Sequence, residues 1–304
     1  MFGGNVRRRA APAPRVVRLR CPAKVNLHLE VLGRRADGYH EIRTVFAAVG
    51  VWDELILTEA ARGEIRLTVI PEGSAPADPT NLVWRAAVEV AAPPAACGVH
   101  LELHKAIPVA GGLGGGSSDA AAALVGLAHL WGSETSGTVL AAAAARLGSD
   151  VPFFLVGGVA LGSGRGGDLR PLPDLPPWWV VLLPGREKTS TGEVYAALGA
   201  DELDADGSSE VYRWAMGGGE LPLAACHNGL QSTVVRRWPE VGRRLELLRN
   251  TGPLMAMVAG SGSTVFALYE SEGHAREVAV HLRDLESVVV PLLSRASSRL
   301  RPSS

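Results

Sequence analysis

The sequence predicts an α+β fold with two domains. Strand-like and helix-like segments occur in both halves of the 304 residues, without the regular alternation that a doubly wound sheet requires. The length suits two ordinary domains, and the composition changes at 171–177, where four of seven residues are proline. We therefore expect a flexible tail at 1–15, a first domain at 16–170 and a second domain at 171–304.

The first domain is expected to begin with strands. Residues 16–31 are strand-like, with a break at Pro22, and further strands are predicted at 45–49, 53–60 and 63–70. The last two alternate well across a short glycine-containing turn, so we expect them to pair with each other. The elements predicted after them are a helix at 81–92, a strand at 98–109, helices at 119–131 and 138–147, and a loop followed by a strand or hairpin at 149–166.

The second domain is expected to begin with a buried strand at 178–185, because that run is continuously apolar. A mixture of helices and strands follows it. The elements predicted there are helices at 191–198, 226–235, 241–248 and 275–283, a strand at 255–270, and a final strand near the C-terminus.

Composition and charge exclude several classes of function. The formal net charge is -1, so no basic surplus favours nucleic acid. Cys21, Cys97 and Cys226 lack metal-site spacing and indicate a reducing compartment. No apolar run approaches the roughly 18 residues of a membrane span, and the N-terminus lacks a signal-like apolar segment. We expect a cytoplasmic protein, a monomer or weak homodimer, without nucleic-acid or membrane partners.

A glycine-rich loop is the most informative motif. PVAGGLGGGSSDAAAAL, Pro108–Leu124, lacks the lysine of a Walker loop and the spacing of a dinucleotide fingerprint. Free N–H groups of a glycine turn and a helix N-terminus bind phosphate, and Ser117 and Ser118 add hydroxyls. The alternative is a tight connection that uses glycine for packing. The predicted phosphate-binding residues are Pro108, Ala110, Gly111, Gly112, Leu113, Gly114, Gly115, Gly116, Ser117 and Ser118.

Three motifs together resemble the galactokinase, homoserine kinase, mevalonate kinase and phosphomevalonate kinase (GHMP) superfamily. They are the glycine loop, CPAKVNLHLEV at 21–31 and MVAGSGSTVFAL at 257–268. The resemblance implies an N-terminal αβ domain like ribosomal protein S5 and a C-terminal αβ sandwich domain, with the active site in the cleft between them. It also implies ATP and Mg²⁺ as cofactors.

Within that superfamily, four segments are similar to the branch that phosphorylates the 2-hydroxyl of 4-diphosphocytidyl-2-C-methyl-D-erythritol for isoprenoid synthesis. The segments are PAKVNLHLEVLGRRADGYHEIRTVF, RLGSDVPFFLVGGVALGSGRG, STGEVYAAL and HNGLQ, although Gly229 and Gln231 depart from that branch's usual residues. The implied partner is a small-molecule cytidine-diphosphate polyol. Two alternatives stay open: another GHMP kinase acting on mevalonate, homoserine or a sugar, and a catalytically silent nucleotide-binding regulator.

The resemblance points to Lys24 and Asp150 as the catalytic pair. A carboxylate beside a lysine stays ionised and accepts the hydroxyl proton, while the ammonium stabilises the developing negative charge. Taken singly, Lys24 could be a solvated strand-edge residue and Asp150 a helix N-cap. The presence of both argues against the silent regulator.

The same resemblance assigns residues to the substrate and nucleotide. Tyr39 and Tyr195 are expected to stack on the cytosine, with His40 and Lys105 as its polar readers. The alternative for Tyr195 is a core position in a helix. Asn26 and Thr191 are candidate contacts to the diphosphate and polyol.

Three further features have two interpretations each. Asn81 opens a helix and is an N-cap, an adenine contact, or both. The second glycine turn at 260–263 supports the first loop or forms a tight hairpin. The glycines at 162–167 could mimic a phosphate cradle, but we interpret them as a strand turn. No carboxylate cluster announces a protein-held metal, which suits a magnesium ion bound by ATP oxygens and water.

Overall fold

A computed structural model describes residues 14–90, 98–132, 136–187, 189–204 and 209–303. Within these ranges the chain has the expected α+β character, with helices packed on two separate sheets. The first is six-stranded in the order β3-β4-β2-β5-β6, and β1 pairs with β2 outside that path. Its strands are β1 (Val16–Arg34), β2 (His40–Ala60), β3 (Ile65–Ile70), β4 (Gly98–His104), β5 (Val159–Ser163) and β6 (Asp168–Leu172).

Strands β1 and β2 form one long antiparallel hairpin. The break expected at Pro22 is instead a register shift between Pro22 and Ala23, within a strand that continues to Arg34. Proline cannot donate a ladder hydrogen bond, so a bulge is where a strand accommodates it. The strands expected separately at 45–49 and 53–60 are likewise parts of the single strand β2.

The pairing expected between 53–60 and 63–70 is wrong. Strand β4 lies between them, antiparallel to β2 and parallel to β3. Gly98 makes this insertion possible, because a Cβ there would lie 1.9 Å from the Ala61 carbonyl oxygen in the connecting turn. Alternation had predicted the strands, but it does not report which strand lies next to which.

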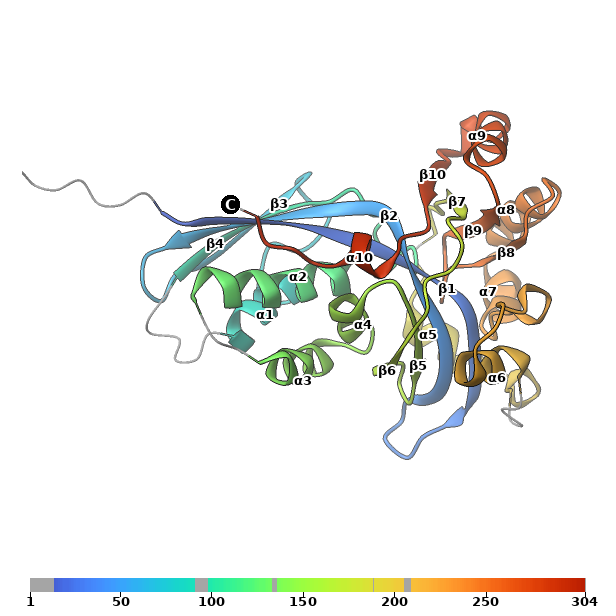
Figure 1. Cartoon of the computed structure of the whole chain (residues 1–304), viewed down its shortest axis with the longest axis horizontal. Helices are drawn as coiled ribbons and strands as arrows, with labels where there is room; N and C mark the ends of the chain where they lie inside the picture. The colour runs from blue at the N-terminus through green and yellow to red at the C-terminus, as the bar shows by residue number, and fades with distance from the viewer. Residues whose placement is uncertain (1–13, 91–97, 133–135, 188, 205–208, 304) are drawn as a thin grey trace, which may run out of the picture.

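Four helices pack with the first sheet: α1 (Leu82–Val90), α2 (Gly115–Leu130), α3 (Gly137–Leu147) and α4 (Val151–Val156). Figure 1 shows them on one side of the long strands. Helix α2 begins at Gly115, four residues before the predicted start, and its buried alanines lie against β1 and β2. Helix α4 was predicted as a loop; Pro152 suits its first turn, and Phe153 and Phe154 are buried in the core.

The second sheet is four-stranded and antiparallel, in the order β10-β7-β9-β8. The strand expected at 255–270 is a hairpin whose turn contains the second glycine motif. The strands are β7 (Trp179–Leu183), β8 (Met255–Val258), β9 (Val265–Tyr269) and β10 (Val288–Pro291). The helices are α5 (Thr191–Ala196), α6 (Glu210–Gly217), α7 (Gln231–Arg237), α8 (Pro239–Arg249), α9 (Glu272–His281) and α10 (Arg295–Ser298). Short 3-10 turns occupy Ala200–Glu202, Leu223–Ala225 and Arg283–Leu285. None of the helices in the described ranges has the length and apolar character needed to cross a bilayer.

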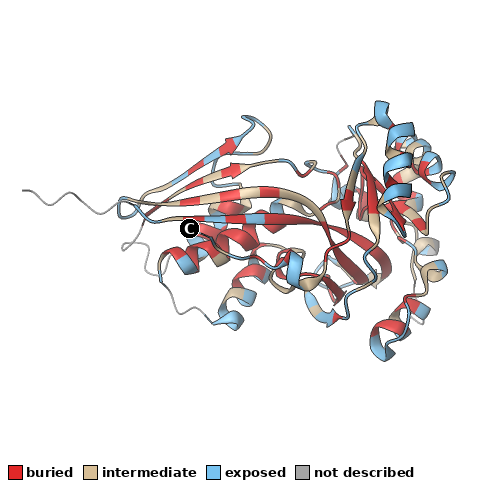
Figure 2. Ribbon diagram, turned by 45° about the horizontal axis from the view of Figure 1, so that its top comes forward, coloured by how far each residue is buried: buried red, intermediate tan, exposed pale blue. Residues whose placement is uncertain are grey.

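Strand β1 passes through all three hydrophobic cores of the molecule. Its residues Leu19, Val25 and Val31 belong in turn to a core under α1–α4, a core between the sheets and a core under α8 and α9. Figure 2 shows the long strands buried through the middle of the molecule, while the outer helices carry most of the exposed surface. Residues 21–31 are buried on both faces, so the polar side chains between the apolar ones are buried as well.

The C-terminal segment returns to the first sheet. Leu293 and Leu300 pack into the first core, and Ser303 forms a backbone bridge with Arg18 on β1. Arg295 Nη2 donates to the carbonyls of Val159 and Leu172 at 2.8 Å each. In Figure 1 this segment, which includes α10, runs back along the long strands to the C-terminus. The last residues of the expected second domain therefore pack with the first.

Candidate active site

A cavity of about 870 Å³ lies between residues of the two halves of the chain. Nine of the predicted site residues line it, and they come from β1, the β1–β2 turn, the glycine loop, the start of α4 and helix α5. These nine are Lys24, Asn26, Tyr39, His40, Gly112, Gly114, Asp150, Thr191 and Tyr195. The remaining predicted residues do not line it; they are Asn81, Lys105, Pro108, Ala110, Gly111, Leu113, Gly115, Gly116, Ser117 and Ser118.

The glycine loop is packed closely on one side and open on the other. A Cβ at Gly112 would lie 1.9 Å from the Ala259 carbonyl oxygen, and one at Gly111 would lie 2.4 Å from Thr264 Oγ1. A Cβ at Gly116 would meet nothing within 4 Å. The packing interpretation therefore holds for Gly111 and Gly112, while Gly116 has the open approach that an anion requires.

The end of the loop leaves backbone donors at the start of α2. Gly114 is the N-cap in the left-handed conformation, φ 72°, and no side chain caps the helix. The first N–H groups of a helix have no intrahelical acceptor, and the macrodipole favours an anion beside them. Ser118 Oγ is buried there without a hydrogen-bond partner in the part of the chain that the structure describes.

Lys24 and Asp150 meet at the cavity wall. Lys24 Nζ lies 3.4 Å from Asp150 Oδ2 and donates to Asn26 Oδ1 at 2.8 Å; Asn26 Nδ2 in turn donates to Thr44 Oγ1 at 2.8 Å. Lys24 is 4% exposed, which excludes a solvated strand-edge role. Asp150 occupies the N-cap position of α4, but its carboxylate makes no capping bond and is directed to Lys24 instead.

The aromatic residues form two separate contacts. The rings of His40 and Tyr195 stack with centroids 4.9 Å apart, whereas Tyr39 is 51% exposed and lies under the Arg165 guanidinium, 3.6 Å away. Burial, with Asp150 adding to it, raises the pKa of Tyr195, so its hydroxyl keeps its proton. Burial, followed by Arg34, lowers the pKa of His40, which favours the neutral ring at neutral pH.

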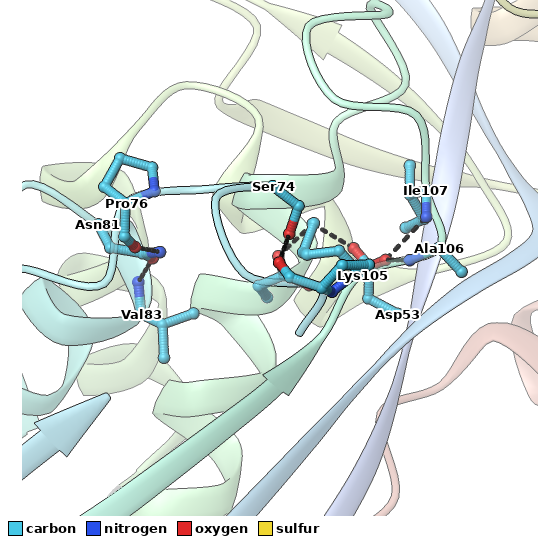
Figure 3. Close-up of polar contacts among 10 residues, drawn as sticks. Asp53, Ser74, Pro76, Asn81, Val83, Lys105, Ala106 and Ile107 are labelled. Carbon is cyan, nitrogen blue, oxygen red and sulfur yellow. Dashed lines mark hydrogen bonds and ion pairs between the residues drawn. The ribbon is translucent and has the colours of Figure 1, made fainter. Parts of the chain in front are cut away.

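Lys105 is a correction to the prediction of a base-reading residue. Its ammonium is buried between the carboxylates of Asp53 and Asp119, the latter 2.6 Å away, and it does not line the cavity that His40 lines. Asp53 Oδ1 also accepts from the N–H groups of Ala106 and Ile107 at 2.6 and 2.8 Å, as Figure 3 shows. Burial alone would lower the pKa of Lys105, but the two carboxylates outweigh it and raise that pKa. Lys105, Asp53 and Asp119 together thus hold in place the segment that leads into the glycine loop.

Asn81 has the geometry of an N-cap. Its Oδ1 accepts from Val83 N at 2.9 Å, and its Nδ2 donates to the Pro76 carbonyl at 2.6 Å (Figure 3). Both ends of the amide are thus bound to the chain itself. The capping interpretation is supported, and the adenine contact stays a prediction.

Two residues of the cavity wall escaped the sequence analysis. The glycines at 162–167 do form a strand turn, as interpreted, but the turn also carries Arg165 over Tyr39. Ser261, in the second glycine turn, lies with its Oγ 2.9 Å from Thr191 Oγ1. A lone arginine between glycines was the available signal for the first; the second had none, because its partner is 70 residues away.

The second glycine turn is held by the segment that departs from the expected pattern. Asn228 Nδ2 donates to the carbonyls of Val258 and Gly260 at 2.9 and 2.8 Å, and Gln231 Oε1 accepts from Val258 N at 3.1 Å. Gln231, one of the two departures, thus helps to hold this turn. The described residues contain no group of three or more histidines, cysteines or carboxylates placed to hold a metal.

Comparisons with known proteins agree with this geometry. Residues 81–158 match the model of the GHMP kinases N terminal domain, and residues 218–286 match that of the GHMP kinases C terminal domain. Curated proteins from three organisms, each named 4-diphosphocytidyl-2-C-methyl-D-erythritol kinase, are 43% identical to this chain. Those from Nocardioides sp., Pelotomaculum thermopropionicum and Thermobifida fusca cover 87%, 88% and 89% of this chain, and the matches cover 92%, 94% and 92% of those proteins.

Solved structures extend the same result. A crystal structure of 4-(cytidine 5'-diphospho)-2C-methyl-D-erythritol kinase matches with a TM-score of 0.74 at 36% identity, covering 91% of this chain and 98% of its own. A homoserine kinase from Cytophaga hutchinsonii matches with a TM-score of 0.66 at 18% identity, covering 98% and 100%, which shows a shared fold only. The chain therefore belongs to the 4-diphosphocytidyl-2-C-methyl-D-erythritol kinase family of the GHMP kinases.

Proposed function

We propose that this protein transfers the γ-phosphoryl group of ATP to the 2-hydroxyl of 4-diphosphocytidyl-2-C-methyl-D-erythritol. The products are the 2-phosphate and ADP, in the methylerythritol phosphate route to isoprenoid precursors. The observation that carries the proposal is the pair of Lys24 Nζ and Asp150 Oδ2, 3.4 Å apart, in a cavity that the glycine loop and the His40–Tyr195 stack also border. The family to which the chain belongs supports the same reaction.

Each member of the pair has a role in the transfer. Asp150, half-buried and beside an ammonium, accepts the proton of the attacking hydroxyl. Lys24 is held between Asn26 and Asp150, so its charge is fixed in place before the reaction begins and stabilises the phosphoryl oxygens as the transfer proceeds. The donors at the start of α2 complement the ATP phosphates, which the glycine loop admits at Gly116.

The nucleoside end of the acceptor distinguishes this reaction from those of related kinases. The stacked rings of His40 and Tyr195 and the exposed Tyr39–Arg165 pair supply flat surfaces at the cavity. Aromatic faces of this kind bind a base by stacking, at about 1–3 kcal/mol each. Mevalonate, homoserine and simple sugars have no base that could use them.

Magnesium fits the site through ATP. Phosphoryl transfer uses Mg²⁺ to neutralise charge on the phosphates, and this ion keeps several water ligands. We propose that phosphate oxygens and water hold it. A cytoplasmic location and a monomer or weak homodimer also stay proposals, as does the absence of nucleic-acid and membrane partners.

An assay of ADP release tests the proposed function. Purified protein with Mg-ATP is supplied in parallel with the cytidyl methylerythritol, mevalonate and homoserine, and the Asp150→Asn variant serves as the control for contaminating kinases. We expect turnover with the first acceptor only, and loss of it in the variant. Turnover with another acceptor would overturn the substrate, and ATP binding without any turnover would favour a regulator.

A further inference from the structure

The loop that enters helix α5 carries a buried ion pair with no role in the chemistry above. Glu187 Oε1 and Oε2 accept from Arg244 Nη1 and Nη2 of α8, at 3.2 and 2.5 Å. The two side chains are only 19% and 13% exposed. Burial opposes ionisation of Glu187, but the Arg244 guanidinium outweighs it and lowers the pKa of the carboxyl. The pair is therefore charged, bidentate and largely removed from water.

The pair meets the second glycine turn at Gly185. A Cβ at Gly185 would lie 2.5 Å from Arg244 Nη2, 2.5 Å from Ser263 Oγ and 2.6 Å from Glu187 Oε2. Atoms from the loop, from α8 and from the turn thus converge on one residue that has no side chain. The ion pair and Ser263 of the turn therefore both lie beside Gly185 of the loop.

The next residues of the loop reach the cavity. Thr189 is buried, its Oγ1 lies 3.5 Å from the Ala110 carbonyl of the phosphate loop, and its Cγ2 faces Gly262. Thr191 Oγ1 lies 2.9 Å from Ser261 Oγ, and both residues line the cavity. Displacement of the loop from the turn would therefore separate the two cavity hydroxyls.

We propose that Glu187 and Arg244 act as a positioning pair that holds Thr191 and Ser261 together as a joint contact for the acceptor's diphosphate and polyol. The proposal rests on the proposed function for the identity of that acceptor. Neither side chain of the pair lines the cavity, so both act through the loop and not on the substrate directly. Their loss is expected to weaken acceptor binding more than ATP binding.

Swapping the charges of Glu187 and Arg244 distinguishes a positioning role from simple structural support. Glu187→Gln and Arg244→Met each remove one charge, and the double variant Glu187→Arg with Arg244→Glu restores the pair with its polarity reversed. We expect each single variant to raise KM for the cytidyl acceptor about tenfold, with KM for ATP within about twofold. The double variant should recover most of the acceptor KM.

A neighbouring pair on the same helix supplies the matched control. Arg243 donates to Glu240 at 2.7 Å, but their side chains are 66% and 56% exposed. Arg243→Met should leave both KM values unchanged. Single variants of Glu187 or Arg244 that lower the melting temperature without changing the acceptor KM, or that raise both KM values equally, would overturn the proposal, as would a double variant no better than the singles.

Amide hydrogen exchange keeps the test independent of activity. Peptides covering 189–191 and 259–264 should exchange faster in Glu187→Gln than in the wild type. Their exchange rates should be unchanged in Arg243→Met. If the wild type fails to phosphorylate the cytidyl acceptor, the proposed function fails, while faster exchange still supports the positioning pair. Unchanged exchange in Glu187→Gln would exclude the pair whatever the substrate is.

Discussion

Lys24 shows how a strand can present a charge inside a protein. The odd-numbered residues of this part of β1 are apolar and face the core, so the even-numbered ones point to the opposite face. That face is covered too, and there Lys24 is paired with Asn26 and Asp150. The Lys24 ammonium is therefore held at a fixed, buried position in the site.

Removing either member of the pair should abolish turnover without unfolding the protein. Lys24→Met and Asp150→Asn are each expected to lower kcat at least about 100-fold, the size of a lost proton acceptor or charge stabiliser. Steady-state kinetics and circular dichroism check the two parts of the prediction. Near-wild-type turnover in a folded variant would remove that residue from the mechanism.

Lys105 should be needed for stability. Its ammonium is shared by Asp53 and Asp119, both almost fully buried, so Lys105→Met leaves both carboxyl groups without their common cation. We expect a loss of about 3–5 kcal/mol in the free energy of unfolding, measured in urea. Arg66→Met, which breaks the exposed pair with Glu64, should cost less than about 1 kcal/mol. Equal effects would contradict the role given to burial.

Sequence analysis predicted that Lys24 and Asp150 act together, and the structure places them 3.4 Å apart, while their catalytic role stays a prediction. It misplaced Lys105, for a physical reason. Lys24 and Asp150 each lie in a short motif that can be recognised in the sequence without knowing what the side chain contacts. The role of Lys105 depends on Asp53, 52 residues away, on a strand that the topology brings beside it. No local pattern contains that information. Arg165 was missed for the same reason, since its partner Tyr39 lies on another hairpin.

At the scale of elements, the glycine loop divides its glycines between two tasks. Gly111 and Gly112 allow the loop to touch the turn at 259–264, and Gly114 supplies the left-handed residue from which α2 begins. Gly116 has free space above it. One motif thus joins the two halves of the chain and leaves a face open to the phosphates.

Alanine at two positions of the loop should separate these tasks. Gly112→Ala places a methyl group against the Ala259 carbonyl at a φ of 77°, so we expect a clear drop in melting temperature. Gly116→Ala meets no atom of the chain within 4 Å and should keep the melting temperature but raise KM for ATP. Thermal melts and ATP kinetics of both variants check this. A destabilised Gly116→Ala would refute the division.

The prediction of elements succeeded where the pattern was local and failed where it was not. Helices α1 and α3 lie where the sequence pattern placed them, and strand β7 lies where its continuous apolar run did, because its alternate residues enter two different cores. Helix α4 was taken for a loop, since six residues are too few for a helical period to be recognised. The position of β4 between β2 and β3 is a matter of pairing, which alternation does not encode.

At the scale of the whole molecule, the two expected domains are joined more closely than a linker would allow. Strands β1 and β2 contribute to the cores of both halves, and residues 293–303 return to the first sheet. We propose that the second domain begins near residue 171, but that residues 293–303 belong with the first domain. The cavity then lies between two bodies that share a hairpin.

This arrangement predicts that the C-terminal segment stabilises the first domain. Leu293 and Leu300 are 8% and 7% exposed in its core, so Leu293→Ala and Leu300→Ala should each cost about 2–5 kcal/mol in urea unfolding. Leu247→Ala on α8, 45% exposed, is the control and should stay within about 0.5 kcal/mol. Costs in the first two variants as small as that of the control would show that the segment only lies on the surface.

The return of Ser303 to Arg18 has a consequence for how the chain is made. Domains commonly fold in order as they leave the ribosome, the N-terminal one first. Here Arg18 on β1 pairs with Ser303, which is made 285 residues later, and the core beneath β1 receives Leu293 and Leu300 only shortly before. The nascent first half must wait for the second with an unfinished core. The emergence of residues 293–303, and not that of residue 170, is the step that closes the fold.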